Sequence, residues 1–271
     1  MAKKQQDNST FPIPTPERWK PVRAMGLARA LMKAGYGTRK QTGKMVAEGR
    51  ISVSGEIILD PNRMLEPGAQ IHLDGEPLAQ LKNSYYAFNK PVRVVCSPSE
   101  GPERRLVSDY FPNNIPGLQT VGRLDGKTVG LLLISNDRRW SNLVTGSKVL
   151  DQEFRVQVEG ELTDLEISVM TAGVHLPNMG LFRPLSVKVV ETLNSRTVVT
   201  MVVREGKIRQ VRRMLSTLRH KVVFVRRIRI GSIRLGDLPV GGIRHLTAGE
   251  IHSIFETEKM AANLASGKDD E

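Results

Sequence analysis

One acidic side chain stands in a glycine-rich turn where it could do chemistry. Asp125 lies between Gly122 and Gly126 in the run VGRLDGKTVG. A lone carboxylate of this kind can act as a nucleophile or as a general base. The ordinary alternative is structural, because Asp-Gly is a common turn sequence. Asp125 is therefore a candidate catalytic residue, and its spacing alone does not decide between the two roles.

The same run partly matches a phosphate-binding loop, but two features argue against a nucleotide triphosphatase. That loop has four residues between its glycines, whereas Gly122 and Gly126 are separated by three. It must also open a helix whose N-terminus binds phosphate. Here the run VGLLLIS follows Thr128, and its apolar, β-branched composition is typical of a strand.

The second candidate is a strongly basic segment, residues 204–234. It holds eleven Lys and Arg against one Glu, a surplus of ten positive charges in a chain whose net charge is +12. Cations at this density repel one another unless an anion docks on them, so RNA or DNA is the expected partner. A solvated basic face is the alternative interpretation.

Within this segment the spacing predicts a helix from about residue 207. Its apolar stripe comprises Ile208, Val211, Leu215 and Leu218. At about 100° per residue, Arg212 lies only about 40° from Ile208, at the edge of the stripe. An arginine that points inward from that edge needs a carboxylate, since a buried unpaired charge is costly.

Composition narrows the class of protein. The chain has 271 residues, 39% of them hydrophobic and 25% charged, which is typical of a folded protein of about two domains. The single cysteine, Cys96, excludes a disulfide framework and a cysteine-based zinc site. The five histidines show no metal-binding spacing. No apolar run is long enough to span a membrane, and we expect a cytoplasmic protein.

The pattern along the chain predicts four parts. Residues 1–22 are polar and proline-containing, as in a flexible arm. Residues 23–82 predict two helices, the second with a Thr38–Gln41 capping box, followed by short strands. Residues 83–257 predict mainly strands, with helices near 137–147 and 207–219, and residues 258–271 a C-terminal tail. The expected strands are YYAFNKP, TVGLLLIS, FRVQVEG, LSVKVVETL, RTVVTMVVREG and VVFVRRIRI.

Several blocks resemble one enzyme family. FNKP at 88–91, VGRLDGKTVGLLLISND at 121–137 and REGKIRQVRRM at 204–214 are similar to the bacterial ribosomal-RNA pseudouridine synthases of the RsuA type. Residues 23–82 resemble the αL RNA-binding motif of a ribosomal protein. The resemblance implies an α+β protein, in which a small αL domain precedes a mixed, largely antiparallel-sheet catalytic domain.

The resemblance also implies a reaction. It predicts isomerisation of uridine to pseudouridine in ribosomal RNA, or in a pre-ribosomal particle, with no cofactor and no metal. Asp125 matches the catalytic Asp, and Arg212 matches the arginine that pairs with it. The target base must leave its stack to react, and Phe154 is expected to stack on it.

RNA contacts are predicted from the basic residues. The expected contacts are Arg39, Lys40 and Arg50 in the first domain, and Arg123, Lys207, Arg209 and Arg213 in the second. The run RQVRRM favours members that act on large-subunit rRNA, and we expect a monomer.

Four positions depart from the family pattern. Gln152 and Phe154 stand where Lys-x-Tyr is common, Arg138 replaces a Gly, and Ile208 replaces an Asn. These departures keep open an alternative from another class, a catalytically silent rRNA-binding assembly factor. Retention of Asp125 and Arg212 favours the enzyme.

Overall fold

The computed structural model describes residues 20–21, 23–79, 82–97, 105–112, 115, 117–193, 195–204 and 208–266. The chain divides into two compact units, Met1–Lys82 and Asn83–Glu271. Most of the arm predicted for residues 1–22, and the end of the predicted tail, lie outside the described residues.

The first unit packs two short helices on small sheets. Strands β1 (Met25–Gly26) and β4 (Met64–Leu65) pair with each other. A second sheet has the order β3-β2-β5-β6, with bounds Glu56–Ile57, Ile51–Val53, Ile71–Leu73 and Glu76–Pro77. Helices α1 (Leu27–Lys33) and α2 (Arg39–Ala47) supply much of its core, which includes Leu27, Leu31, Val46, Ile51 and Ile71.

The predicted capping box of α2 is confirmed. The Gln41 amide donates to the Thr38 hydroxyl oxygen at 3.2 Å, and the Thr38 amide donates to the Gln41 side-chain carbonyl oxygen at 2.8 Å. These bonds satisfy amides that a helix start leaves unpaired.

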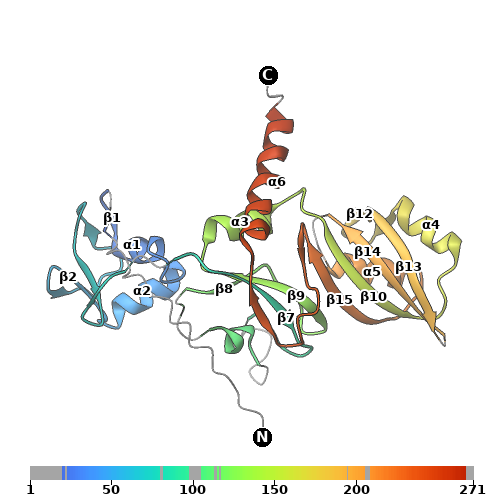
Figure 1. Cartoon of the computed structure of the whole chain (residues 1–271), viewed down its shortest axis with the longest axis horizontal. Helices are drawn as coiled ribbons and strands as arrows, with labels where there is room; N and C mark the ends of the chain where they lie inside the picture. Colours follow the sequence, from blue (N-terminus) through green and yellow to red (C-terminus); the bar gives the residue numbers. More distant parts are fainter. Residues whose placement is uncertain are drawn as a thin grey trace, which may run out of the picture. The chain divides into compact units, whose positions relative to one another are not determined.

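The second unit is built on one large, mixed sheet (Figure 1). Its order is β13-β14-β10-β15-β9-β7-β17, with β16 beside β15 and β8 beside β9. All its pairings are antiparallel except that of β15 with β9, so the predicted α+β class with a largely antiparallel sheet is confirmed. The bounds are β7 Tyr85–Lys90, β8 Gln119–Val121, β9 Thr128–Ser135, β10 Gln152–Glu159, β13 Ser186–Leu193, β14 Arg196–Val203, β15 Val222–Ile230, β16 Ile233–Arg234 and β17 Ile243–His245. A separate hairpin joins β11 (Val174–Leu176) to β12 (Gly180–Phe182).

Strand β9 is the buried centre of this sheet. Every residue of TVGLLLIS is buried, as expected for a strand covered on both faces. Its side chains alternate between two cores: Leu131 and Leu133 belong to one, Leu132 and Ile134 to the other. The loop that carries Asp125 leads directly into this strand, so the candidate catalytic residue is attached to the most buried element of the unit.

Gly130 is required where β9 meets β15. Its φ is +96°, and a Cβ at this position would lie 2.3 Å from the carbonyl oxygen of Arg227. Only glycine lets the two backbones come this close. The glycine in the run TVGLLL therefore serves the parallel contact between the two strands.

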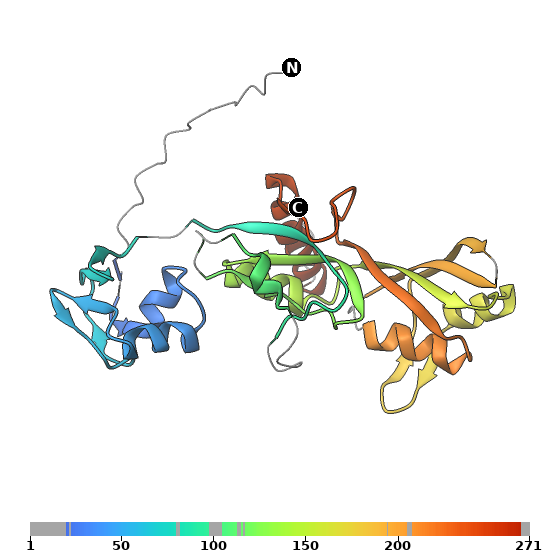
Figure 2. The same cartoon turned by 90° about the horizontal axis from the view of Figure 1, so that it is seen from below.

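Helices and a short turn of 3₁₀ helix complete the unit. They are η2 (Val107–Tyr110), α3 (Arg138–Gly146), α4 (Asp164–Ala172), α5 (Ile208–Thr217) and α6 (Ala248–Ser266). Helix α3 packs against α6, and the Trp140 indole N–H donates to the Ile251 carbonyl at 3.2 Å (Figure 1). Helix α5 (orange) lies along β15 in Figure 2.

The sequence prediction missed α4 and α6, although each begins with a Thr-x-x-Glu capping pattern. Thr163 and Glu166 exchange hydrogen bonds at the start of α4, and Thr247 and Glu250 do so at the start of α6. The predicted tail from residue 258 is therefore wrong as far as Ser266, because α6 continues through it.

We expect Glu250→Gln to lower the Tm by about 2–5 °C at neutral pH. Glu250 accepts two hydrogen bonds from Arg244, at 2.7 and 2.8 Å, and one from the Thr247 amide. The pKa of Glu250 lies below its ordinary 4.5, chiefly because of the hydrogen bonds from Arg244. A carboxylate with a depressed folded pKa stabilises the fold above its unfolded pKa, and this contribution is lost as pH falls through the folded pKa.

Thermal unfolding at a series of pH values measures the effect. The difference in Tm between the two proteins should shrink below about pH 4.5. Glu256→Gln, which changes a half-exposed glutamate on the same helix, is the matched control and should change the Tm little. A difference for Glu250→Gln that stays constant into acid would contradict this account.

Candidate active site

Asp125 occupies the loop between β8 and β9, and backbone amides fix its carboxylate. One oxygen, Oδ1, accepts from the amides of Lys127 at 3.0 Å and Thr128 at 2.7 Å. This is the turn geometry that the structural interpretation of Asp-Gly predicts. The other oxygen, Oδ2, faces the guanidinium of Arg212, with Nε at 3.9 Å. The side chain of Asp125 is 35% exposed, so a substrate can reach it.

Arg212 reaches Asp125 from helix α5. Ile208, Val211 and Leu215 are buried, whereas the Arg212 side chain is 24% exposed, as its predicted edge position requires. Its Nη2 donates to the Thr128 hydroxyl at 3.2 Å. Its Nε is buried and makes no hydrogen bond, so this nitrogen faces Asp125 at ion-pair distance without being engaged elsewhere. The inward Arg212 predicted from helix periodicity has the carboxylate neighbour that it needs.

Thr128 connects the parts of this site, a role that the sequence analysis did not assign. Its amide binds Asp125, its hydroxyl binds Arg212, and its carbonyl accepts from the buried ammonium of Lys90 at 2.9 Å. Thr128 itself is fully buried. A Thr three residues after the candidate Asp could have suggested an Asx-turn partner, but its contact with α5 depends on tertiary packing.

Phe154 lies in the hydrophobic core shared with α5. Its exposed fraction is 0%, and its cluster includes Val211 and Met214. The ring is therefore covered in this conformation, and stacking on a base would require neighbouring side chains to move.

The neighbours of Phe154 on β10 are bound to arginines of β15. Gln152 Oε1 accepts from Arg227 Nη1 at 3.0 Å, and Glu153 forms an ion pair with Arg229 at 2.7 Å. The departures from Lys-x-Tyr thus change which groups hold β10 and β15 together.

The Asn136-Asp137 pair in the family-like block has a structural role here. Asp137 caps α3 by accepting from the amides of Arg139 and Trp140, and the Tyr85 hydroxyl donates to its other oxygen at 2.7 Å. Burial, together with Asp137, raises the pKa of Tyr85 to about 12, so this phenol remains a donor at neutral pH. The departure at Arg138 falls on the exposed first residue of the helix.

The residues predicted to bind RNA fall into three groups. Lys40 and Arg209 are exposed and have no carboxylate partner among the described residues. Arg39, Arg50 and Arg213 are exposed but hydrogen-bonded to Asn62, to Asp74 and to the Pro177 carbonyl. Arg123 is exposed beside the Asp125 loop, and Lys207 lies outside the described residues.

More cations of the basic segment have an acidic partner than its sequence indicates. Strand β10 and its flank supply three carboxylates from outside the segment, which pair with Arg204, Lys221 and Arg229 at 3.1, 2.7 and 2.7 Å: Asp151, Glu159 and Glu153. The expectation of a cluster without counter-charges is therefore wrong for these three cations. The sequence could not reveal the pairing because it depends on the register of β10 against β14 and β15.

Comparison with known proteins identifies the family. The family model for RNA pseudouridylate synthase matches residues 84–217. An uncharacterized RNA pseudouridine synthase of Aquifex aeolicus (strain VF5) is 30% identical over 229 residues, covering 83% of this chain and 92% of that protein. The chain belongs to the RsuA-type family of RNA pseudouridine synthases. It is thus an isomerase, as the resemblance of its motifs implied.

Other relatives agree with this assignment. Ribosomal small subunit pseudouridine synthase A of Escherichia coli (strain K12) is 32% identical over 222 residues, covering 80% of this chain and 94% of that protein. Ribosomal large subunit pseudouridine synthase B of Bacillus subtilis (strain 168) is 26% identical over 228 residues, covering 83% and 93%.

A solved structure supports the fold as well. A crystal structure of a pseudouridylate synthase superposes with a TM-score of 0.59 at 26% identity, covering 85% of this chain and 99% of that one. Within the described residues, no helix is both long and apolar enough to cross a membrane.

We expect Thr128→Val to lower kcat by about tenfold while leaving the KM for RNA nearly unchanged. The change removes the hydroxyl that holds Arg212, a hydrogen bond to a charged group worth about 1.5 kcal/mol. It leaves the backbone bond to Asp125 and the surface cations in place. Steady-state isomerisation with RNA measures both constants.

Thr128→Ser is the matched control, because it keeps the hydroxyl and should restore most of the rate. Equal losses in the Val and Ser variants would contradict this account, because the Ser variant keeps the hydroxyl that binds Arg212.

Proposed function

We propose that this protein isomerises a specific uridine of ribosomal RNA to pseudouridine, with Asp125 as the catalytic residue. One observation carries the proposal. The Asp125 carboxylate is fixed by two backbone amides on one oxygen and faces Arg212 on the other, beside a segment rich in cations. The named relatives act on the RNA of either ribosomal subunit.

Asp125 has to be ionised for either of its possible roles. It attacks the ribose C1′, or it removes a proton from the neighbouring carbon. In both routes the N1–C1′ bond breaks, the uracil turns, and a C5–C1′ bond forms. In the first route the bond between C1′ and the carboxylate breaks as the C5–C1′ bond forms, and in the second the carboxyl group returns its proton to the carbon. C5 then loses its proton and N1 gains one, so the reaction is balanced without an oxidant, a reductant or a second substrate. Arg212 is the cationic neighbour of this carboxylate in both routes, with its Nε 3.9 Å from Oδ2.

The target uridine must leave its stack before Asp125 can reach it, at a cost of a few kcal/mol. Arginine and lysine contacts to phosphates supply binding free energy that offsets this cost and makes binding dependent on salt. We place these contacts on both units. We propose that the protein works as a monomer in the cytoplasm. We also propose that its substrate is large-subunit RNA, because of the run RQVRRM.

We expect Asp125→Asn to abolish isomerisation while changing the Kd for RNA by less than about threefold. The Asn side chain keeps an oxygen that can accept from the Lys127 and Thr128 amides, but it carries no charge and is a poor base or nucleophile. Release of tritium from C5-labelled uridine in RNA measures the reaction, and filter binding measures the Kd. Asp151→Asn, at the residue just before β10, is the control that should leave activity in place.

The cellular test is a map of pseudouridines in both ribosomal RNAs, with and without this protein. Loss of a site that reappears with the wild-type chain, but not with Asp125→Asn, supports the proposal. An unchanged map would reject the enzyme and favour the alternative, an assembly factor that binds ribosomal RNA without modifying it.

For the first unit we expect Lys40→Met to weaken RNA binding more than Arg50→Met does. Lys40 is exposed without a carboxylate partner, whereas Arg50 is already paired with Asp74, whose pKa this arginine lowers. Each lost phosphate contact should reduce the slope of log K against log salt by about 0.7–0.9. A larger loss for Arg50→Met would show that the Asp74 pair opens to bind RNA.

A further inference from the structure

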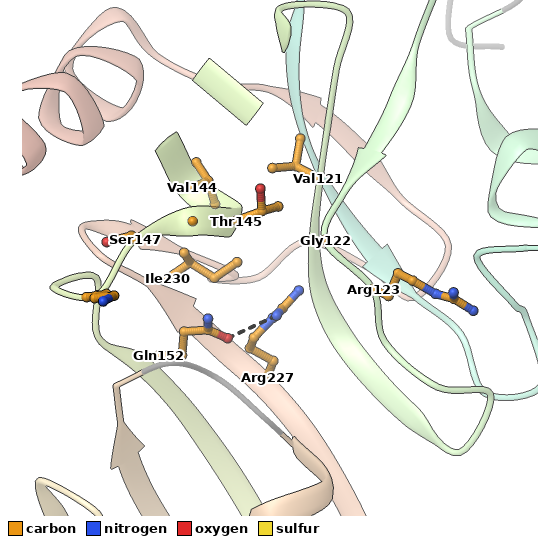
Figure 3. A pocket seen from close by; sticks show the side chains of 11 residues that line it. Val121, Gly122, Arg123, Val144, Thr145, Ser147, Gln152, Arg227 and Ile230 are labelled. Atoms are coloured by element: carbon orange, nitrogen blue, oxygen red, sulfur yellow. Dashed lines mark hydrogen bonds between the residues drawn. The ribbon is translucent and has the colours of Figure 1, made fainter. Parts of the chain in front are cut away.

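A cavity of about 330 Å³ lies beside the loop that carries Asp125 (Figure 3). Three branched aliphatic side chains form part of its wall: Val121, Val144 and Ile230. Its polar lining includes Thr145 and Gln152, and none of its lining residues is acidic. Neither Asp125 nor Arg212 lines this space, although it is bordered by Gly122 and Arg123, just before Asp125 in the chain.

The guanidinium of Arg227 points into this cavity, whereas the side chain of Arg123 points away from it (Figure 3). Arg227 is only 4% exposed. Its Nε donates to the Leu131 carbonyl at 2.8 Å and its Nη1 to Gln152 at 3.0 Å, but its buried Nη2 has no partner. Among the described residues no carboxylate lies within ion-pair distance of it. Burial lowers its pKa to about 10, so it remains charged at neutral pH.

An unpaired donor on a buried cation is expensive. Leaving such a donor unsatisfied costs the desolvation free energy of the group with nothing to offset it, and a well-packed apolar residue of similar size often stabilises the fold more than a buried charge does. The fold itself gains little from Nη2. A ligand that brings an acceptor oxygen or nitrogen into the cavity would remove this cost.

The position of the cavity indicates which ligand fits. The reactive side of the loop faces α5, where Asp125 meets Arg212 and Thr128. The cavity instead lies against the end of α3 and the strands β10 and β15. An RNA strand that presents one nucleotide to Asp125 therefore brings a neighbouring nucleotide to this opening.

The cavity walls favour the base of that neighbour over its phosphate. A base projects from the chain and has flat apolar faces that fit between aliphatic side chains, and its edge carries hydrogen-bond acceptors. A phosphate is part of the backbone and usually gathers several donors or cations. Here the only buried cation of the lining is Arg227, in a partly apolar space, whereas the other two, Arg123 and Lys148, are exposed.

Building on the proposed RNA substrate, we propose that this cavity binds the base of a nucleotide that flanks the target uridine, with Arg227 Nη2 donating to an acceptor on its edge. The cavity thereby fixes the position of the RNA next to the catalytic loop. Arg227 is a substrate-binding residue in this account, not a catalytic one.

The test uses the full chain and the ribosomal RNA fragment that it protects in footprinting. Single abasic nucleotides are placed in turn across the footprint, and the Kd is measured for wild type and for Arg227→Met. For the wild type we expect one position other than the target to weaken binding by about five- to tenfold, the value of one good hydrogen bond with its packing. For Arg227→Met, which lacks the donor, that position should have little further effect.

A second variant keeps the test valid if Arg227→Met does not fold. Thr145→Trp fills the cavity from an exposed position of α3 and leaves the buried arginine itself in the sequence, and it should abolish the same abasic effect. Lys148→Met, which removes an exposed cation that also lines the cavity, is the matched electrostatic control.

Three outcomes would overturn the proposal. One is the absence of any flanking position whose abasic form weakens binding. Another is an equal abasic effect in the wild type and in both cavity variants. The third is a drop of about 0.7–0.9 in the salt slope for Arg227→Met, because that would mean a phosphate contact. All of these are binding measurements, so they remain interpretable even if no uridine is isomerised.

Discussion

Three contacts that hold the site together converge on Thr128, the first residue of the central strand. Asp125 is held by the Thr128 amide, Arg212 by the Thr128 hydroxyl, and Lys90 by the Thr128 carbonyl. Three separate segments, the loop after β8, the end of β7 and helix α5, are thereby brought to one buried residue. Because β9 is covered on both faces, this residue cannot shift without disturbing two hydrophobic cores.

This arrangement explains how a partly exposed carboxylate keeps a fixed geometry. Surface ion pairs are weak because two flexible side chains must be ordered to form them. Here backbone amides order the carboxylate, and a helix packed through Val211 and Leu215 orders the cation. The distance of 3.9 Å between Arg212 Nε and Asp125 Oδ2 leaves the carboxylate oxygen without a direct hydrogen bond to Arg212. That oxygen therefore remains available to a substrate.

Local signals in the sequence predicted much of this, and long-range packing determined the rest. The Thr38 cap, the β9 run and the position of Arg212 on its helix depend on residues close together in the chain, and all three are found in the structure. The three contacts made by Thr128 and the burial of Phe154 depend on which strands pair with each other. No short stretch of sequence contains that information. The sequence analysis missed helices α4 and α6 despite their capping patterns, because their apolar residues recur only weakly at helical spacing.

The cations of segment 204–234 have different surroundings. These surroundings distinguish the cations that stabilise the fold from those that are available to bind RNA. Arg204, Lys221 and Arg229 are compensated by carboxylates on or beside β10, so they hold strands and loops together. Arg212 forms an ion pair with Asp125, and Arg227 is buried in the interior. What remains exposed for phosphate is a smaller set that includes Arg209 on α5 and Arg219 in the turn that follows this helix. Since Arg209 shares helix α5 with Arg212, RNA bound to Arg209 would be held by the same element that positions the ion pair proposed for catalysis.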